Sequence, residues 1–449
     1  MIGHRPVRRW WSECETFPRD RLAQQQLTAL RRQLSYVYQA STLHRRRMLD
    51  IGWHPADLTD LDSLRNLPII DKADYLDGLR EDPPWGTTRA ADPEAVQRVH
   101  FSSGSTGDPV PVLWTGPDLD RWADLYARMA YGQGIRDRDV YLCLFSYPWF
   151  VGGLGATAGY QRIGATVVPG GSADTHRQID TIFRYGVTAV GGTPSFLLHL
   201  AEVAEQSGRP LRDCPVRRVM VGGEPGGAVP ATRALIEQAW GARCFDGYGC
   251  LEFQPVAWEC EEQAGGHLAE DFVHAEVLHP RTREPVPDGT TGVLVLTHLD
   301  KQATPLVRFW TGDLVVRDST GCGCGRTHAR LAGGVLGRAD DMLVVRGVNV
   351  FPSAVEQVLR EHPAGRGQYQ IVLDADVTDR HSGYLTGIKV EIEVPDGTAT
   401  ATATAELTAA LRQVLRVRAQ VVAVAPGSLP RHTHKARRVV RRGGGTERT

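Results

Sequence analysis

The stretch that decides the fold runs ATVVPG (165–170), RQIDTIFRYG (177–186), PSFLLHLAEVAEQ (194–206) and VRRVMVGG (216–223). Short β-rich runs alternate here with helical patterns, and an earlier run, VYLCLF (140–145), extends the alternation toward the N-terminus. Strand and helix in turn predict parallel sheets covered by helices. We therefore expect an α/β fold from about residue 95 to residue 299.

The flanks of this region follow other patterns. Residues 19–49 carry apolar side chains at helical spacing, which predicts one long amphipathic helix. After Gly337, MLVVRGVNV (342–350) predicts a strand pair or tight hairpin, PSAVEQVLREH (352–362) a helix, and YLTGIKVEIEV (384–394) a strand. These elements predict a small α+β domain. The Ala/Thr run 397–405 is expected to be a loop and cap before the helix AELTAALRQVL (405–415), and GRADD (337–341) a linker.

The composition is that of an ordinary globular protein: 449 residues, 42% hydrophobic, 23% charged, with a formal net charge of -1. The balanced charge argues against nucleic acid as a partner. No run of about 18 apolar residues or signal core is found, so we expect a cytoplasmic protein with no membrane partner. Eight cysteines, scattered except for Cys322 and Cys324, fit a reducing compartment. Only four of the 51 basic residues are lysines: Lys72, Lys301, Lys389 and Lys435.

The strongest local motif is FSSGSTGDPV (101–110), in which hydroxyl residues alternate with glycines. Glycine lets the backbone approach an anion closely, and Ser and Thr add donors, so the loop suits a di- or triphosphate. A flexible surface turn is the alternative. The candidate phosphate-binding residues are Ser102, Ser103, Gly104, Ser105, Thr106 and Gly107.

Several ordered motifs together resemble the adenylate-forming acyl-activating enzymes, and within them the phenylacetate-CoA ligase branch. They are LRNLPIIDKADYLDG (64–78), the phosphate loop, FSYPWFVGGLGA (145–156), GGTPSF (191–196), VGGEPGG (221–227), YGCLEFQPVAWEC (248–260), VRFWTGDL (307–314), GRADDMLVVRGVNVFPSAVE (337–356) and LPRHTHKARRVVR (429–441). The resemblance covers nearly the whole chain. It implies a large N-terminal adenylation domain, residues 1–338, and a small mobile C-terminal domain, residues 339–449.

The resemblance also implies ATP-dependent activation of a carboxylic acid, for which the site must offset the repulsion of two anions. Glu252 would hold Mg²⁺ and Lys435 would bridge the acid and the α-phosphate, since a compact ammonium on a flexible stem can reach both. Asp313 would accept the ribose hydroxyls, Arg338 would contact the nucleotide, and Tyr248 would stack on the base. The remaining implied nucleotide-binding residues are Gly222, Gly223, Glu224, Pro225 and Asp246. Each has a plainer interpretation alone, such as a surface charge, a turn or simple packing.

The implied acid pocket is walled by aromatic and small residues: Tyr147, Trp149, Phe150, Gly192, Thr193, Pro194 and Gly247. Aromatic walls favour a flat acid, although these side chains would serve equally well in a core. Between its two half-reactions the small domain of the family rotates about a hinge, which Asp340 matches. Gly347 would then line a pantetheine channel, or simply serve as a hairpin turn.

Cys260, His267, Cys322 and Cys324 supply three thiols and an imidazole, a donor set that suits a closed structural zinc site. Members of this branch can carry such a metal. Free buried thiols are the alternative, and His328 or Cys250 are substitute ligands.

The chain departs from the family pattern at three positions. Asp108 replaces the usual lysine of the phosphate loop, Leu251 replaces a hydroxyl residue before Glu252, and His434 replaces the glycine before Lys435. An acid near a triphosphate is expected to weaken ATP binding unless Mg²⁺ or an arginine compensates.

We therefore predict an ATP- and Mg²⁺-dependent ligase that converts a small aromatic carboxylic acid to acyl-AMP and transfers it to coenzyme A. Transfer to a carrier-protein thiol or an amine is the alternative within the class. A degenerate nucleotide-binding scaffold is the alternative outside it. The branch often forms dimers, so the resemblance also implies a homodimer.

Overall fold

The computed structural model describes residues 9–102, 109–147, 151–171, 173–339, 341–379, 382–394, 399–430 and 438–442. A twelve-stranded sheet organises residues up to 338. Its parallel half has the order β4-β3-β5-β6-β7. These strands are β3 (Val140–Cys143), β4 (Thr166–Pro169), β5 (Ala189–Gly192), β6 (Arg218–Gly222) and β7 (Arg243–Tyr248). The parallel prediction is confirmed for this half.

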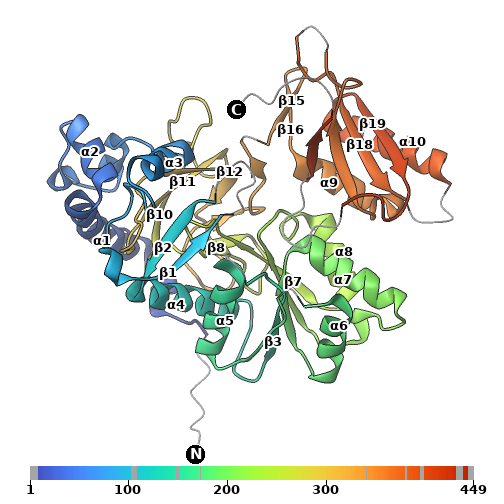
Figure 1. Ribbon diagram of the computed structural model, residues 1–449, viewed down its shortest axis with the longest axis horizontal. Helices are drawn as coiled ribbons and strands as arrows, with labels where there is room; N and C mark the ends of the chain where they lie inside the picture. Colours follow the sequence, from blue (N-terminus) through green and yellow to red (C-terminus); the bar gives the residue numbers. More distant parts are fainter. Residues whose placement is uncertain are drawn as a thin grey trace, which may run out of the picture.

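Helices cover both faces of the parallel half (Figure 1). On one face α4 and α5 pack against Tyr141 and Cys143; on the other, α6, α7 and α8 pack against Leu142 and Leu144. Successive side chains of β3 thus point to opposite faces and both are buried, as in a doubly covered sheet. The bounds are α4 (Gly116–Gly132), α5 (Val151–Ile163), α6 (Thr175–Arg184), α7 (Pro194–Gln206) and α8 (Pro230–Trp240).

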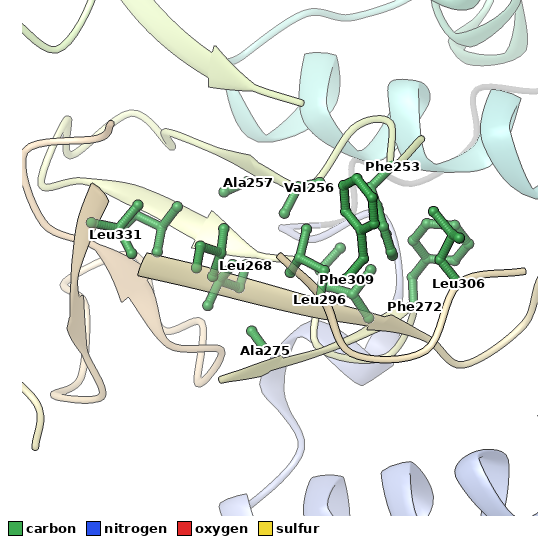
Figure 2. Packing of buried hydrophobic residues seen from close by; sticks show 14 of the residues in the cluster. Phe253, Val256, Ala257, Leu268, Phe272, Ala275, Leu296, Leu306, Phe309 and Leu331 are labelled. Atoms are coloured by element: carbon green, nitrogen blue, oxygen red, sulfur yellow. The ribbon is translucent and has the colours of Figure 1, made fainter. Parts of the chain in front are cut away.

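The other half of the sheet is antiparallel, which corrects the expectation of parallel pairing up to residue 299. Residues 249–331 contain no helix, so successive strands connect by turns and loops rather than by crossover helices. The strands are β8 (Ala257–Trp258), β9 (Gly266–Leu268), β10 (Val273–Leu278), β11 (Thr291–His298), β12 (Phe309–Asp318), β13 (Arg330–Leu331) and β14 (Gly337–Arg338). Figure 2 shows Phe253, Leu268, Leu296 and Phe309 within the core that these strands enclose.

A separate antiparallel hairpin, β1 (Val96–Phe101) with β2 (Pro111–Thr115), precedes the main sheet in the chain. β1 and β2 flank the phosphate-loop motif in the sequence, and its two ends are paired: the Val110 N–H donates to Ser102 Oγ and the Ser102 N–H donates to the Val110 carbonyl, each at 3.0 Å. Ser102 therefore lies at the base of the loop.

The long N-terminal helix is in fact two helices, α1 (Arg19–Ala40) and α2 (Thr42–Asp50), followed by α3 (Lys72–Glu81). Ser41 interrupts the helix because its backbone is extended and its hydroxyl donates to the Thr87 carbonyl at 3.1 Å. Helical spacing continued through this residue, so periodicity did not show the break. None of the helices in the described parts of the chain is both long and apolar enough to span a bilayer.

Residues from 343 onward form their own hydrophobic core around a four-stranded sheet of order β19-β18-β17-β20. The predicted hairpin, helix and strand are all present.

The prediction of a loop for the Ala/Thr run is wrong, because α10 begins at Thr400 and includes most of the run. Alanine favours a helix. The linker GRADD also begins as a strand, since Gly337 and Arg338 pair with β12. The elements are β15 (Leu343–Val345), β16 (Val348–Val350), α9 (Pro352–Glu361), β17 (Tyr369–Leu373), β18 (Ile388–Glu393), α10 (Thr400–Leu415), β19 (Ala419–Val424) and β20 (Val439–Arg441). We call residues 9–338 the large lobe and residues from 343 onward the small lobe; the domain boundary at 338/339 stays a prediction.

Candidate active site

The predicted nucleotide and acid residues gather where neighbouring parallel strands end. Tyr147 follows β3, Thr193 follows β5, Glu224 follows β6, and Tyr248 ends β7. Since β3, β5, β6 and β7 are adjacent and parallel, their carboxyl ends share one edge of the sheet. Open α/β sheets bind ligands at that edge.

Asp313, Tyr248 and Arg338 form a contact group at this edge. Tyr248 Oη donates to Asp313 Oδ2 at 2.5 Å, and Arg338 Nη1 donates to Asp313 Oδ1 at 3.3 Å. Asp313 and Arg338 lie directly opposite each other because β12 and β14 pair in that register. Burial raises the pKa of Tyr248 well above its usual value, so its hydroxyl remains a donor. The site thus presents a carboxylate and a guanidinium together.

The turn after β6 brings a second carboxylate to the same edge. Glu224 Oε1 accepts the Ser195 N–H at 2.7 Å, near the N-terminus of α7. Gly223 has a φ of +88°, a left-handed conformation that glycine adopts without strain. The chain therefore turns at the end of β6, and Glu224 and Pro225 follow Gly223 in that turn.

Asp246, on β7, lies beside a second acid. Glu259 accepts the Asp246 N–H at 2.8 Å and pairs with Arg233 through both carboxylate oxygens, each at 2.8 Å. Burial, then the charge of Glu259, raises the pKa of Asp246 to about 7. The chain at Gly227 passes close to the Asp246 carboxylate, since a Cβ added to Gly227 would lie only 2.3 Å from Asp246 Oδ1.

This raised pKa predicts a pH-dependent stability. A raised carboxyl pKa means that the folded state holds the proton between about pH 4 and 7, so a rising pH favours the unfolded state in that window. We expect Asp246→Asn to raise the free energy of unfolding at pH 8 by about 1–2 kcal/mol, the shift being discounted for partial exposure, and to change little at pH 4. Urea denaturation at both pH values measures this. An equal difference at the two pH values would contradict the assignment.

Glu252 is half-buried, and burial raises its pKa. Its backbone is one partner of His298, whose Nδ1 accepts the Leu306 N–H at 3.1 Å and whose ring stacks on Phe253 at 3.8 Å. Burial lowers the pKa of His298 well below its usual value, so the ring is neutral. Sequence reasoning missed His298, because a histidine within an apolar strand carries no local signal.

The described acid-site residues lie at the ends of β3, β5 and β7, and Tyr147 contacts α5. Tyr147 Oη and Thr157 Oγ1 are 2.8 Å apart, and a Cβ on Gly171 would lie 2.7 Å from the Tyr147 ring. Gly192 ends β5, and Gly247 follows Asp246 in β7, where a Cβ would lie 3.2 Å from Met129 Sδ. The buried hydroxyl of Thr193 has no hydrogen-bond partner among the described residues. Tyr147 thus lies beside Gly171 and Thr157, whereas Gly192, Thr193 and Gly247 lie at the ends of neighbouring strands.

Several predicted residues lie outside the described residues, so their roles stay predictions. They are Ser103, Gly104, Ser105, Thr106, Gly107, Asp108, Trp149, Phe150, Asp340, His434 and Lys435. Gly347 is described: it forms the turn of the β15–β16 hairpin with a φ of +82°. The turn interpretation of this glycine is therefore confirmed.

Cys260, His267, Cys322 and Cys324 come together, with one ligand atom from each within 4.8 Å of the others. Cys260 Sγ lies 3.8 Å from Cys322 Sγ, and Cys324 Sγ lies 3.5 Å from His267 Nε2. Tetrahedral zinc with Zn–S of about 2.3 Å and Zn–N of about 2.0–2.1 Å separates its ligand atoms by about 3.5–3.8 Å. The residues therefore fit the ion. His328 does not serve as a substitute, because its two ring nitrogens contact the Leu268 and Cys14 carbonyls at 2.9 and 3.0 Å.

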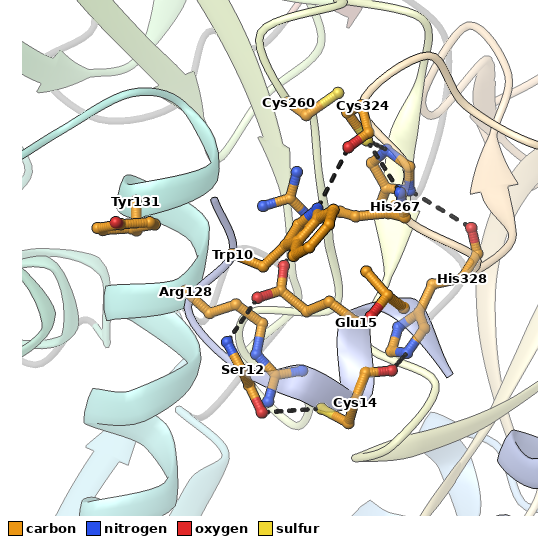
Figure 3. Close-up of polar contacts among 12 residues, drawn as sticks. Trp10, Ser12, Cys14, Glu15, Arg128, Tyr131, Cys260, His267, Cys324 and His328 are labelled. Atoms are coloured by element: carbon orange, nitrogen blue, oxygen red, sulfur yellow. Dashed lines mark hydrogen bonds and ion pairs between the residues drawn. The ribbon is translucent and has the colours of Figure 1, made fainter. Parts of the chain in front are cut away.

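The N-terminal segment 10–17 packs on this Cys/His cluster (Figure 3). Trp10 Nε1 donates to the Cys324 carbonyl at 3.2 Å, and Arg326 Nε donates to Glu15 Oε2 at 2.6 Å. Both residues of this ion pair are almost fully buried. The loop 322–328 thus links the Cys/His cluster to the start of the chain.

Comparison with known proteins assigns the class. A family model described as AMP-binding enzyme matches residues 51–298, and one described as AMP-binding enzyme C-terminal domain matches residues 347–442. The chain belongs to the AMP-binding enzymes, which form acyl-adenylates.

Within that family, the chain is similar to CoA ligases of known sequence and structure. A phenylacetate-coenzyme A ligase of Thermus thermophilus is 38% identical over 387 residues, which are 86% of this chain and 84% of the relative. A solved structure of 2-hydroxyisobutyryl-CoA ligase in the postadenylation state has a TM-score of 0.91 at 29% identity, covering 98% of this chain and 94% of that one. The same ligase in the thioesterification state has a TM-score of 0.74 at the same identity and coverage.

Proposed function

We propose that the protein is an ATP-dependent ligase that converts a small aromatic carboxylic acid to an acyl-adenylate and then transfers the acyl group to coenzyme A. The observation that carries the proposal is the convergence of the Asp313–Tyr248–Arg338 group with the aromatic and small residues at the same sheet edge. The similarity to phenylacetate-coenzyme A ligases supports both the acid class and the acceptor.

Each residue has a role that its chemistry allows. Asp313 would accept hydrogen bonds from the two ribose hydroxyls. The Tyr248 hydroxyl would then give up its hydrogen bond to Asp313 Oδ2, and Arg338 would stay close to the nucleotide. The turn at Gly223 and Glu224 would border the base. The serine- and glycine-rich loop that begins at Ser102 would supply donors to the phosphates.

Two residues would help to offset the negative charges that meet when the acid attacks ATP. Glu252 would hold Mg²⁺ through its carboxylate oxygens, and the ion would offset phosphate charge when bound. Lys435 would reach both the acid oxygen and the α-phosphorus as the adenylate forms. The segment 431–437 joins two anchored parts of the small lobe: Leu429 donates its N–H to Glu393 at 2.8 Å, and β20 pairs with β17. Arg438 directly follows this segment, and the charges of Tyr369, Glu356 and, from the large lobe, Glu224 raise its pKa.

The acid would lie between the end of β3 and α5. The Tyr147 hydroxyl is paired with Thr157, so the Tyr147 ring is held in place and would present an apolar wall. The Thr193 hydroxyl, which has no hydrogen-bond partner within the described parts of the chain, would bond a polar group of the acid. A flat ring fits such a wall better than a branched chain does.

Acyl transfer would follow rotation of the small lobe about Asp340. In the present arrangement the β15–β16 hairpin exposes the apolar side chains of Val344 and Val348, with 50% and 37% of their surface accessible. Gly347 at its tip would line the pantetheine channel once that hairpin turns toward the large lobe. We further propose that the Cys/His cluster holds zinc as a structural ion, since four protein ligands leave no position for a substrate.

The proposed function predicts acid-dependent exchange of pyrophosphate into ATP. Benzoic and phenylacetic acids are expected to stimulate exchange at least tenfold over branched aliphatic acids, and addition of coenzyme A to yield the thioester, detected by mass spectrometry. Thioester formation on a phosphopantetheinyl carrier protein, but not on free coenzyme A, would show that the carrier protein is the acceptor. ATP binding by calorimetry without exchange for any acid would contradict the function and favour a degenerate scaffold.

A further inference from the structure

The large and small lobes meet where α8 contacts α9 (Figure 1). Two hydrogen bonds cross this contact. Thr232 Oγ1 donates to Glu356 Oε1 at 3.0 Å, and the Ala231 N–H donates to Gln357 Oε1 at 3.0 Å. Ala231 lies in the first turn of α8, where backbone N–H groups have no partner within the helix, so a side chain of the small lobe caps a helix of the large lobe.

Glu356 is buried, with 4% of its surface accessible, and its contacts extend through the small lobe. Tyr369 Oη donates to Glu356 Oε2 at 3.2 Å, and Arg360 Nε lies 3.6 Å from Oε1. The guanidinium of Arg438 lies 4.4 Å from the centre of the Tyr369 ring. Arg438 directly follows the segment 431–437 that contains Lys435, so one network joins α8 of the large lobe to the end of that segment.

This network depends on the lobe arrangement. The chain resembles the postadenylation state of 2-hydroxyisobutyryl-CoA ligase with a TM-score of 0.91, but its thioesterification state with only 0.74, over the same 98% of this chain. A rotation of the small lobe would separate α9 from α8 and break both crossing hydrogen bonds. Glu356 would keep Tyr369 and Arg360 as partners, because all three belong to the small lobe, so separation leaves no unpaired charge.

We propose that Thr232 and Gln357 form an interlobe latch with Glu356 and the first turn of α8, which holds the lobes in the arrangement that forms the adenylate. Thr232 and Gln357 are positioning residues for the first half-reaction and do not touch the substrates. The inference rests on the proposed function, since it assigns the latch to one of the two half-reactions. Among the described residues the Ser353 hydroxyl also donates to the Leu336 carbonyl across the lobe boundary, close to the link between the lobes. The α8–α9 contact itself carries only the two hydrogen bonds of the latch, so we expect the latch to open without unfolding either lobe.

The test separates the two half-reactions. In the full-length enzyme, Thr232→Val removes one donor at nearly constant volume, and Gln357→Leu removes the helix cap. Each is expected to lower acid-dependent pyrophosphate exchange about 5–20-fold, as loss of a hydrogen bond between the lobes would. Thioester formation from supplied acyl-adenylate and coenzyme A is expected to be unchanged or faster. Equal effects on both half-reactions, or none on either, would overturn the latch.

A second measurement does not depend on activity. Spin labels on the exposed residues Tyr185, directly after α6, and Val414 of α10 report the distance between the lobes. Thr232→Val is expected to broaden the distribution of this distance toward other arrangements. Thr181→Val on α6, where the hydroxyl bonds only within its own helix, and Gln413→Leu at an exposed position of α10 are matched controls expected to behave as wild type. If wild type shows no acid-dependent exchange, the proposed function fails on its own account, and an unchanged distance distribution then overturns the latch.

Discussion

Replacing Lys435 with alanine is expected to lower acid-dependent pyrophosphate exchange by about 10²–10³-fold, the range found when one preorganised donor to the negative charge of a transition state is removed. The reason is charge: the acid oxygen and the α-phosphate are both anionic, and an ammonium between them offsets their repulsion as they approach. Lys435→Arg is expected to lower the exchange rate by a similar factor, because a planar guanidinium does not replace a compact ammonium. Radiolabelled pyrophosphate exchange at saturating ATP measures the loss.

The matched control for this lysine lies in the same lobe. Lys389 Nζ contacts Asp374 Oδ2 at 2.8 Å and Asp376 Oδ2 at 2.9 Å, so its charge is already paired. Lys389→Ala is expected to keep exchange within about twofold, since exposed ion pairs contribute little. Thioester formation from supplied acyl-adenylate is expected to survive in Lys435→Ala. A wild-type rate of pyrophosphate exchange in Lys435→Ala would show that Lys435 takes no part in adenylate formation.

The parallel half of the fold could be predicted from sequence because its signals are local. β3, β4, β5 and β6 are each followed by a helix, which gives a repeating local pattern, and the run VRRVMVGG at β6 marks a strand and its turn together. The antiparallel half could not be predicted in this way. Its pairing depends on which distant strands meet, as with β9 beside both β8 and β13, and short strands of two or three residues carry no periodicity.

The same distinction holds for the site. Glu224, Tyr248 and Asp313 could be singled out because each belongs to a local sequence motif: Glu224 lies just after β6, Tyr248 ends β7 and Asp313 lies within β12. His298 and Thr232 could not, since their roles depend on partners at Glu252 and Glu356, far away in the sequence. The break at Ser41 was missed for the same reason, because its cause is the carbonyl of Thr87 in another segment.

Loss of one metal ligand is expected to have the largest effect on stability. Cys322→Ser is expected to reduce bound zinc from one ion per chain to well below one half, and to lower the free energy of unfolding of this region by on the order of 4 kcal/mol. The loop of Cys322 and Cys324 also holds the N-terminal segment through Trp10 and Glu15, so loss of the ion is expected to expose residues 10–17 to protease. Elemental analysis, tryptophan fluorescence and limited proteolysis measure the three effects.

Cys214→Ser is the matched control for that variant, because Cys214 is a half-buried free cysteine outside the cluster. It is expected to keep the zinc content and the protease resistance of wild type. Chelation of wild-type protein at neutral pH should reproduce the Cys322→Ser result, since thiolates and a neutral imidazole hold the ion only while deprotonated, and acid should do the same. Wild-type protein purified without zinc, yet with a protected N-terminal segment, would show that the four side chains pack as free thiols and that the loop needs no ion.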